Sequence, residues 1–150
     1  VRSIERQIER EKRELLIKAI ENYKSGKLQD ALNDLDIILS QNKFNVSGLI
    51  YRGMTLQKLE YHTNAISDFD NAIKWKPNEA NLYFLRGSSK LQIYDLISAR
   101  LDIERAAKLS PDVLEYSSNL QIVDILLNEP ELQAEMKQDA FNRGMMKTRV

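Results

Sequence analysis

The feature that most limits how this chain can fold is a set of sequence columns that recur every 34 positions. Two columns hold one residue type throughout: Ala31, Ala65 and Ala99, and Asp34, Asp68 and Asp102. A repeat of about this length with helical patterning is typical of helix-turn-helix units, each of which buries its apolar face only by stacking on its neighbours. The period therefore predicts an all-α fold, a stack of antiparallel helix pairs.

Other columns alternate small and large side chains. The small column is Ala19, Gly53 and Gly87, and the large column is Leu35, Phe69 and Ile103. Two helices approach to about 8–10 Å only where one of the facing side chains is small, so we expect the small residues at helix crossings and the large ones between units. Pro77 and Pro111 are expected to end the second helix of their units, because proline lacks an amide donor.

Taken together, these columns resemble the tetratricopeptide repeat family. The second unit carries seven residues of the type that the family expects: Leu49, Gly53, Leu56, Ala65, Phe69, Ala72 and Pro77. Arg52 stands where the family usually has leucine, and Lys90 stands at an aromatic position of the third unit. The resemblance covers roughly residues 12–111 and implies a right-handed α-solenoid, a superhelix of antiparallel helix pairs.

We expect one domain without a long linker. It comprises a helical extension over 1–11, repeats over 12–45, 46–79 and 80–113, and capping helices over 114–150. Helices are predicted at 2–24, 28–41, 46–59, 62–74, 79–92, 96–108, 112–127 and 130–143. Gly26 is expected to close the first helix, and Ser110 with Pro111 to open the seventh. The chain begins at Val1 without methionine, which favours a piece of a longer protein.

Composition excludes several classes of function. The 22 basic and 22 acidic residues balance, and they form no basic stripe of the kind that binds nucleic acid. No apolar run approaches the roughly 20 residues of a membrane span. With no cysteine, one histidine and no glycine-rich phosphate loop, we expect no enzyme activity, no catalytic residue, no metal and no cofactor. The absence of cysteine favours the cytoplasm.

The two ends of the chain are expected to differ from its middle. Residues 1–14 are expected to form a charged helix with a thin apolar stripe of Val1, Ile4, Ile8 and Leu15. This helix is either a solvated overhang or a seam that docks on another helix. At the other end, Gln121 and Gln133 replace small residues, so the last two helices are expected to form a cap. The seventh helix is apolar on more than one side, and we expect the eighth to cover it through three side chains, Leu132, Met136 and Phe141.

A basic column runs beside the aspartate column. Lys18, Arg52 and Arg86 each precede an aspartate of the same unit by sixteen positions. This spacing predicts a ladder of ion pairs between packed helices, with a basic strip for an acidic peptide as the alternative. Two single residues have plain interpretations: His62 is expected to be a solvated turn residue, and Trp75 to pack in the core.

The resemblance also implies where a partner would bind, because in the family the first helices of the units line a concave groove. The positions that face it map to Arg13, Leu16, Ile17, Ile20 and Tyr23; Ser47, Ile50, Tyr51, Met54 and Gln57; and Asn81, Phe84, Leu85, Ser88 and Leu91. Chaperone-tail-binding members have a lysine, asparagine and arginine clamp there, but the clamp positions here hold Leu16, Ile20, Tyr51, Asn81 and Leu85. A carboxylate-clamp ligand is therefore not expected.

An apolar groove of this kind suits an amphipathic partner helix, read through anchors at i, i+3, i+4 and i+7. We therefore predict a non-catalytic protein-interaction module whose partner is another protein's helix or peptide. Two alternatives stay open. In the first, the groove is filled by another segment of this chain or by a second copy of it. In the second, the domain is a structural subunit whose groove and end helices are permanently buried in a larger assembly.

Overall fold

The computed structural model describes residues 1–144 and 147–150, and every regular element within them is a helix. The helices are α1 (Arg2–Lys24), α2 (Leu28–Gln41), α3 (Val46–Lys58), α4 (His62–Trp75), α5 (Ala80–Gln92), α6 (Leu96–Leu109), α7 (Leu114–Asn128) and α8 (Pro130–Asn142). Each begins and ends within two residues of its predicted bounds. None of these helices is long and apolar enough to cross a bilayer.

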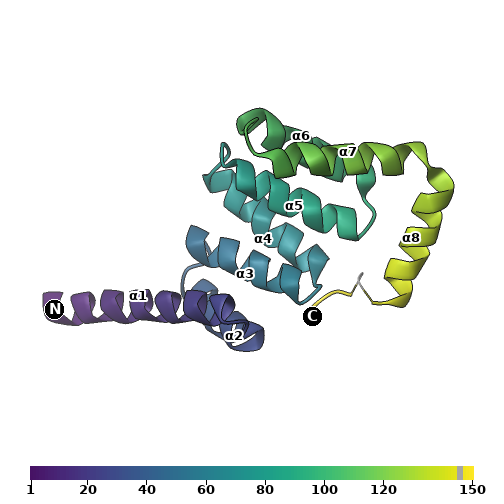
Figure 1. The fold of residues 1–150 in the computed structure, drawn as a ribbon. Helices are drawn as coiled ribbons and strands as arrows, with labels where there is room; N and C mark the ends of the chain where they lie inside the picture. Colours follow the sequence, from purple (N-terminus) through teal and green to yellow (C-terminus); the bar gives the residue numbers. More distant parts are fainter. Residues whose placement is uncertain (145–146) are drawn as a thin grey trace.

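The helices pair within units and stack in chain order (Figure 1). α1 packs on α2, α3 on α4 and α5 on α6, while α7 lies on α6 as the first helix of a further unit would. First helices of neighbouring units, α1 with α3 and α3 with α5, approach each other more closely than the second helices do. The first helices therefore form the inner side of the stack, and the second helices form its outer side.

Small residues lie at the helix crossings, as predicted. Ala65 and Phe69 are fully buried. A β-carbon added to Gly53 would lie 2.6 Å from Cε1 of Phe69, and one added to Gly87 would lie 2.9 Å from Cγ1 of Ile103. No side chain fits at either glycine without displacing the large residue opposite. These crossings fix how closely the two helices of each unit pack.

The turn inside each unit uses a left-handed backbone at the same column. Gly26 has φ of 77° and follows the C-cap residue of α1, as predicted. The equivalent residues in the next two units are not glycines: Glu60 has φ of 66° and Tyr94 has φ of 60°. Because a side chain in this conformation costs roughly 1 kcal/mol, the stacking of the second and third units must hold these turns in place.

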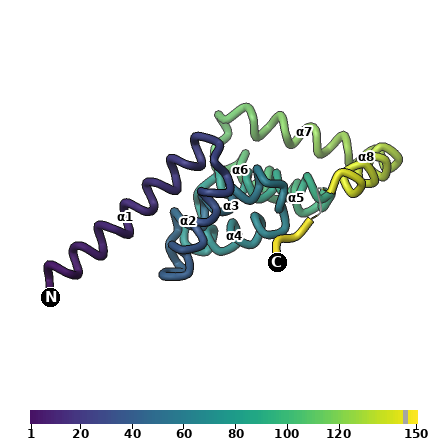
Figure 2. Tube along the Cα trace, turned by 90° about the horizontal axis from the view of Figure 1, so that it is seen from below, coloured from purple at the N-terminus to yellow at the C-terminus, as the bar shows by residue number. Residues whose placement is uncertain are grey.

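The first helix projects beyond the stack, as Figures 1 and 2 show. Residues 1–14 are all exposed, and in the apolar stripe Val1 is 93% and Ile4 65% accessible. Leu15, the last residue of the stripe, is half-buried against the first unit. The overhang expected from the sequence is therefore confirmed. Docking of another helix on its stripe stays a prediction.

The C-terminal end corrects two predictions. Ser110 ends α6 and does not cap α7, whose N-cap is Val113 without a side-chain hydrogen bond. The eighth helix does not cover the seventh: it turns away and runs beside the ends of α5 and α3 (Figure 1). The three side chains expected to cover α7 stay exposed, Leu132 by 37%, Met136 by 36% and Phe141 by 66%.

The glutamines at the small positions account for this departure. Gln121 and Gln133 stand one period after Gly87 and Ala99, the pair that lets α5 and α6 cross closely. Gln133 Nε2 instead donates to the carbonyl oxygen of Leu126 at 2.9 Å. A close α7–α8 crossing cannot form over two amide side chains, so the stack ends there.

Candidate functional site

The residues predicted to line the groove lie on the first helices α1, α3 and α5, and none of them is fully buried. Four are exposed: Arg13, Ile17, Ser47 and Asn81. The others, Leu16, Ile20, Tyr23, Ile50, Tyr51, Met54, Gln57, Phe84, Leu85, Ser88 and Leu91, are half-buried. We call this set the inner face. Its assignment as a binding surface stays a prediction.

Aromatic and amide contacts join the units across the inner face. The rings of Tyr23 and Tyr51 meet edge to face with centroids 5.7 Å apart. Phe84 packs on Tyr116 of α7 at 4.8 Å. Gln57 Nε2 donates at 2.8 Å both to the carbonyl oxygen of Leu85 and to Oγ of a buried serine of α5. Contacts between neighbouring units therefore hold these side chains of the inner face in place.

Two hollows border the inner face. One, of 190 Å³, is lined by residues of α1 with the end of α2 and the turn after it, and it includes Arg13 and Leu16 of the inner face. The other, of 290 Å³, lies where α3 and α5 end and includes Gln57 and Ser88. Both are too small for a helix but large enough for a single side chain.

His62 contradicts its sequence interpretation, because it is 4% exposed and not solvated. Its Nδ1 lies 3.1 Å from Oγ of Ser89, and its Nε2 is buried without a hydrogen-bond partner in the described residues. The pKa of His62 is lowered below 6.5, mainly because burial disfavours the charged imidazolium. The negative charge of Glu60 raises this pKa, and the positive charge of Lys147 lowers it further. His62 is the first residue of α4, and α5 packs over it. Its position beside a turn in the sequence therefore did not reveal that it is buried.

Trp75 contradicts its interpretation as well. It is 57% exposed and meets the ring of Phe44 edge to face at 5.7 Å. These aromatic side chains line a hollow of 410 Å³ with Lys43, Asn71 and Lys74. The family position that the sequence assigned to the core thus lies at the surface here.

The predicted ion-pair ladder forms in the second and third units. Arg52 donates two hydrogen bonds of 2.8 Å to the carboxylate of Asp68. Arg86 does the same to Asp102 at 2.8 and 2.7 Å. Asp68 and Asp102 are almost fully buried, and bidentate pairing is what satisfies both of their oxygens. The structural interpretation of these two pairs is therefore confirmed.

The ladder fails in the first unit. Asp34 accepts a hydrogen bond of 3.2 Å from Nδ2 of Asn22, and the exposed Lys18 forms no ion pair within the part of the chain that the structure describes. The amine of lysine has no rigid fork that pairs with both oxygens of a carboxylate at once, so Lys18 cannot form the bidentate contact that the arginines of the other two units form.

Each arginine also reaches the preceding unit, a contact that the sequence analysis missed. Arg52 Nη1 donates to Asp36 at 3.2 Å, and Arg86 Nη1 donates to Asp70 at 2.9 Å. We call Asp36, Arg52 and Asp68 the second rung, and Asp70, Arg86 and Asp102 the third rung. The repeat carried a signal for this contact, since Asp36, Asp70 and Glu104 also keep the 34-residue interval.

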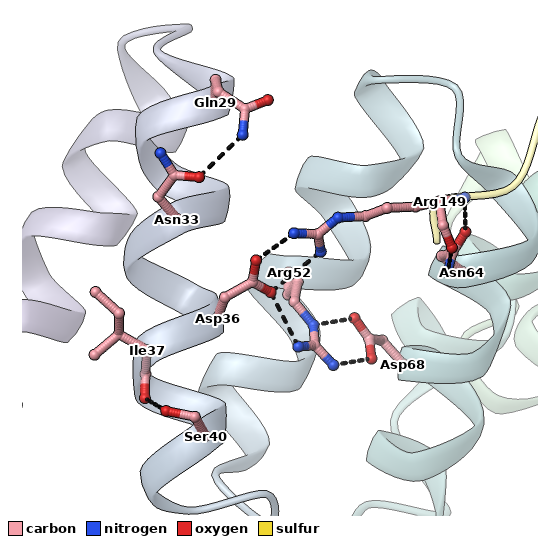
Figure 3. Close-up of polar contacts among 9 residues, drawn as sticks. All are labelled: Gln29, Asn33, Asp36, Ile37, Ser40, Arg52, Asn64, Asp68 and Arg149. Carbon is pink, nitrogen blue, oxygen red and sulfur yellow. Dashed lines mark hydrogen bonds and ion pairs between the residues drawn. The ribbon is translucent and has the colours of Figure 1, made fainter.

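A further contact was missed because nothing periodic marks it. Arg149, near the end of the chain, forms an ion pair with Asp36 and two backbone hydrogen bonds with Asn64 (Figure 3). Burial acts to raise the pKa of Asp36, but hydrogen bonds and charges from Arg149 and Arg52 outweigh it and hold that pKa below 3.8. Asp36 therefore stays ionised between two guanidinium groups.

Among the described residues, no three histidine, cysteine, aspartate or glutamate side chains gather as a metal site requires. The buried carboxylates are already matched by arginines.

No protein-family model matches the chain, and no curated protein matches it in sequence. Solved structures do resemble it. The first TPR of Spaghetti (RPAP3), bound to the HSP90 peptide SRMEEVD, is 22% identical, with a TM-score of 0.74 over 79% of this chain and 94% of that chain. MamA (41-end) from Desulfovibrio magneticus RS-1 is 18% identical, with a TM-score of 0.76 over 87% and 74%.

A third resemblance is to the Yersinia enterocolitica type III secretion chaperone SycD in complex with a peptide of the translocator YopD. It is 18% identical, with a TM-score of 0.64 over 87% of this chain and 92% of that chain. These similarities show that the chain has the fold of the tetratricopeptide repeat proteins, a right-handed α-solenoid of antiparallel helix pairs.

Proposed function

We propose that this domain is a non-catalytic interaction module that docks an amphipathic helix or peptide of another protein on its inner face. The observation that carries the proposal is the row of half-buried apolar side chains along three successive first helices, which includes Leu16, Ile50 and Phe84. Such side chains retain accessible apolar area that a partner's apolar stripe can cover.

The chemistry of the inner face favours an apolar anchor over a carboxylate. The positions of a carboxylate clamp hold Leu16, Ile20, Tyr51, Asn81 and Leu85, which include no cation. The two hollows at its borders combine apolar surface with charged and amide side chains, and Ser88 adds a hydroxyl to the second; these polar groups can orient a bound segment. Two of the similar structures were solved with a bound peptide, which is consistent with this use of the fold.

A matched pair of isoleucines tests the proposal. Ile17 is 55% exposed on the inner face, and Ile97 is 72% exposed on α6 of the outer side. Because both side chains are exposed, glutamate at either position is expected to leave the fold intact. Helical peptides selected from an amphipathic library for binding to the wild type are expected to lose about tenfold or more in affinity to I17E and to I50E, and to keep their affinity for I97E.

Fluorescence anisotropy with the labelled peptides measures this difference, and circular dichroism verifies that each variant is folded. Equal affinity for the wild type, I17E and I50E would show that the inner face is not the docking surface.

A second candidate function is a structural subunit of a larger assembly. The exposed apolar side chains of α7 favour it, because Leu114 is 77%, Ile122 50% and Ile125 56% accessible. Light scattering separates the two candidates. An adaptor is expected to keep a monomer mass, whereas a subunit is expected to self-associate and to return to a monomer when Ile122 and Ile125 are replaced by lysine.

A further inference from the structure

Two residues of the second helices, Asp36 on α2 and Asn64 on α4, bind the side chain and the backbone of Arg149 at the same time. Asn64 Oδ1 accepts from the backbone N–H of Arg149 at 2.7 Å, and Asn64 Nδ2 donates to the carbonyl oxygen of Arg149 at 3.2 Å. The guanidinium of Arg149 pairs with both oxygens of Asp36, with Nη1 at 3.1 Å from Oδ1 (Figure 3). These groups lie on α2 and α4 and hold a residue from the end of the chain.

Each half of this grip has a distinct selectivity. A single amide that bonds both the N–H and the C=O of one residue recognises a peptide backbone whatever its side chain. A carboxylate that meets two guanidinium nitrogens selects arginine, because the ammonium group of lysine offers no matching fork. Together they recognise an arginine within a peptide segment.

The second rung prepares the carboxylate for this role. Arg52 is held by the two oxygens of the buried Asp68 and donates its remaining Nη1 to Asp36. Two carboxylates and one guanidinium leave the second rung with one negative charge, and Arg149 supplies the missing positive charge. The charge of the site is thus complementary to one arginine.

The third rung shows what a completed rung looks like. It has the same two carboxylates and one guanidinium, but Lys90 Nζ lies 2.9 Å from Asp102 and balances the charge from within the unit. The second unit has Leu56 at the position of Lys90, one period earlier. Leu56 and Arg149 both line the 230 Å³ hollow beside the second rung. Because leucine carries no charge, the second rung lacks a cation that the third rung provides for itself.

We propose that the second rung and Asn64 form a docking site for an arginine-bearing peptide segment of a partner protein, and that residues 147–150 of this chain occupy the site in the absence of that partner. The second rung takes Arg52 from α3, but the site shares no residue with the inner face, so the proposal is independent of the inner face. Lys147 adds to the resident contact, since its Nζ lies 4.6 Å from the ring centroid of Tyr61.

A peptide titration tests the proposal on the full chain. The probe is the peptide Lys-Thr-Arg-Val, capped at both ends, and its control is Lys-Thr-Ala-Val. Binding is followed by NMR through the side-chain amide of Asn64 and the Nε–H of Arg52. In R149A the resident arginine is gone, so half-saturation is expected at a peptide concentration roughly tenfold or more below that of the wild type, in which the tethered tail competes.

Two further variants assign the contacts. N64A and D36N, each combined with R149A, are expected to abolish the titration, whereas D70N with R149A is its matched control and is expected to leave it unchanged. I17E is also expected to have no effect, which separates this site from the inner face. Thermal melting verifies that each variant is folded.

Three results would overturn the proposal. The first is equal binding of the two peptides to R149A. The second is an Asn64 amide signal that does not move when Arg149 is replaced, since that would place the tail elsewhere. The third is a mass that doubles with concentration in the wild type but not in R149A, because the occupant would then be the tail of a second copy.

Discussion

The middle of the solenoid and its two ends place the same residue types in opposite environments. Phe69 in the second unit is completely buried, while Phe141 on α8 is 66% exposed. Asp68 is gripped by both nitrogens of an arginine fork, while Asp34 in the first unit receives one longer hydrogen bond. The difference teaches that stability here depends on a neighbour on both sides, as expected for stacked repeats.

Removing the two phenylalanines gives the largest expected contrast. Phe69→Ala empties the space opposite Gly53 and is expected to lower the free energy of unfolding by about 3–5 kcal/mol. Phe141→Ala is expected to change it by no more than about 0.5 kcal/mol. Urea unfolding followed by circular dichroism measures both, and similar losses would mean that the ends share the cooperativity of the middle.

The two aspartates give the next contrast. Asp68→Ala leaves Arg52 with only Asp36 and is expected to cost about 2–3 kcal/mol, less than the roughly 3–5 kcal/mol of a fully buried pair. Asp34→Ala is expected to cost less than about 1 kcal/mol. An unchanged melting temperature in D68A would instead favour the alternative in which Arg52 serves a ligand.

Adding bulk sharpens the comparison from the opposite direction. Ala65→Leu places three extra carbons at a crossing with no free space and is expected to cost about 1–3 kcal/mol. Ala134→Leu on the exposed surface of α8 is the matched change and is expected to be neutral within about 0.5 kcal/mol. If Ala134→Leu destabilises the protein as much as Ala65→Leu, then α8 is packed as tightly as the units.

The smallest expected effect concerns pH and the buried His62. Its pKa is lowered in the folded state, so the unfolded chain binds a proton more readily, and stability falls as the pH drops below 6.5. Melting temperatures from about pH 7.5 to about pH 5.5 are expected to decrease in the wild type and to decrease less in His62→Asn. Identical pH profiles of the two proteins would show that other groups dominate.

The sequence predicted well whatever the 34-residue period encodes. Helix bounds, the crossings at Gly53 and Ala65 and two of the three ion pairs follow from residues that recur in register, because recurring residues meet equivalent neighbours. Asp36 and Asp70 also recur with the period. Their contacts to the next unit can be recognised only once the relative positions of the helices are known.

What the period does not encode was not predictable. Arg149 lies 113 residues from Asp36 in sequence, and no pattern links them. The exposure of Trp75 and the burial of His62 depend on which element packs over each turn, which residue type alone does not determine. The predicted position of α8 was wrong for the same reason. The apolar surface of α7 does not ensure that the next helix packs over that surface.

The two glutamines that end the stack also affect a contact near its middle. Because Gln121 and Gln133 keep α8 off α7, the chain turns back along the edge of the solenoid and returns to the second unit, where Arg149 lies. The same two residues thus set both the number of packed helix pairs and the position of Arg149. Replacing both glutamines by alanine would let α8 pack on α7 and would, by the same change, carry Arg149 away from Asp36.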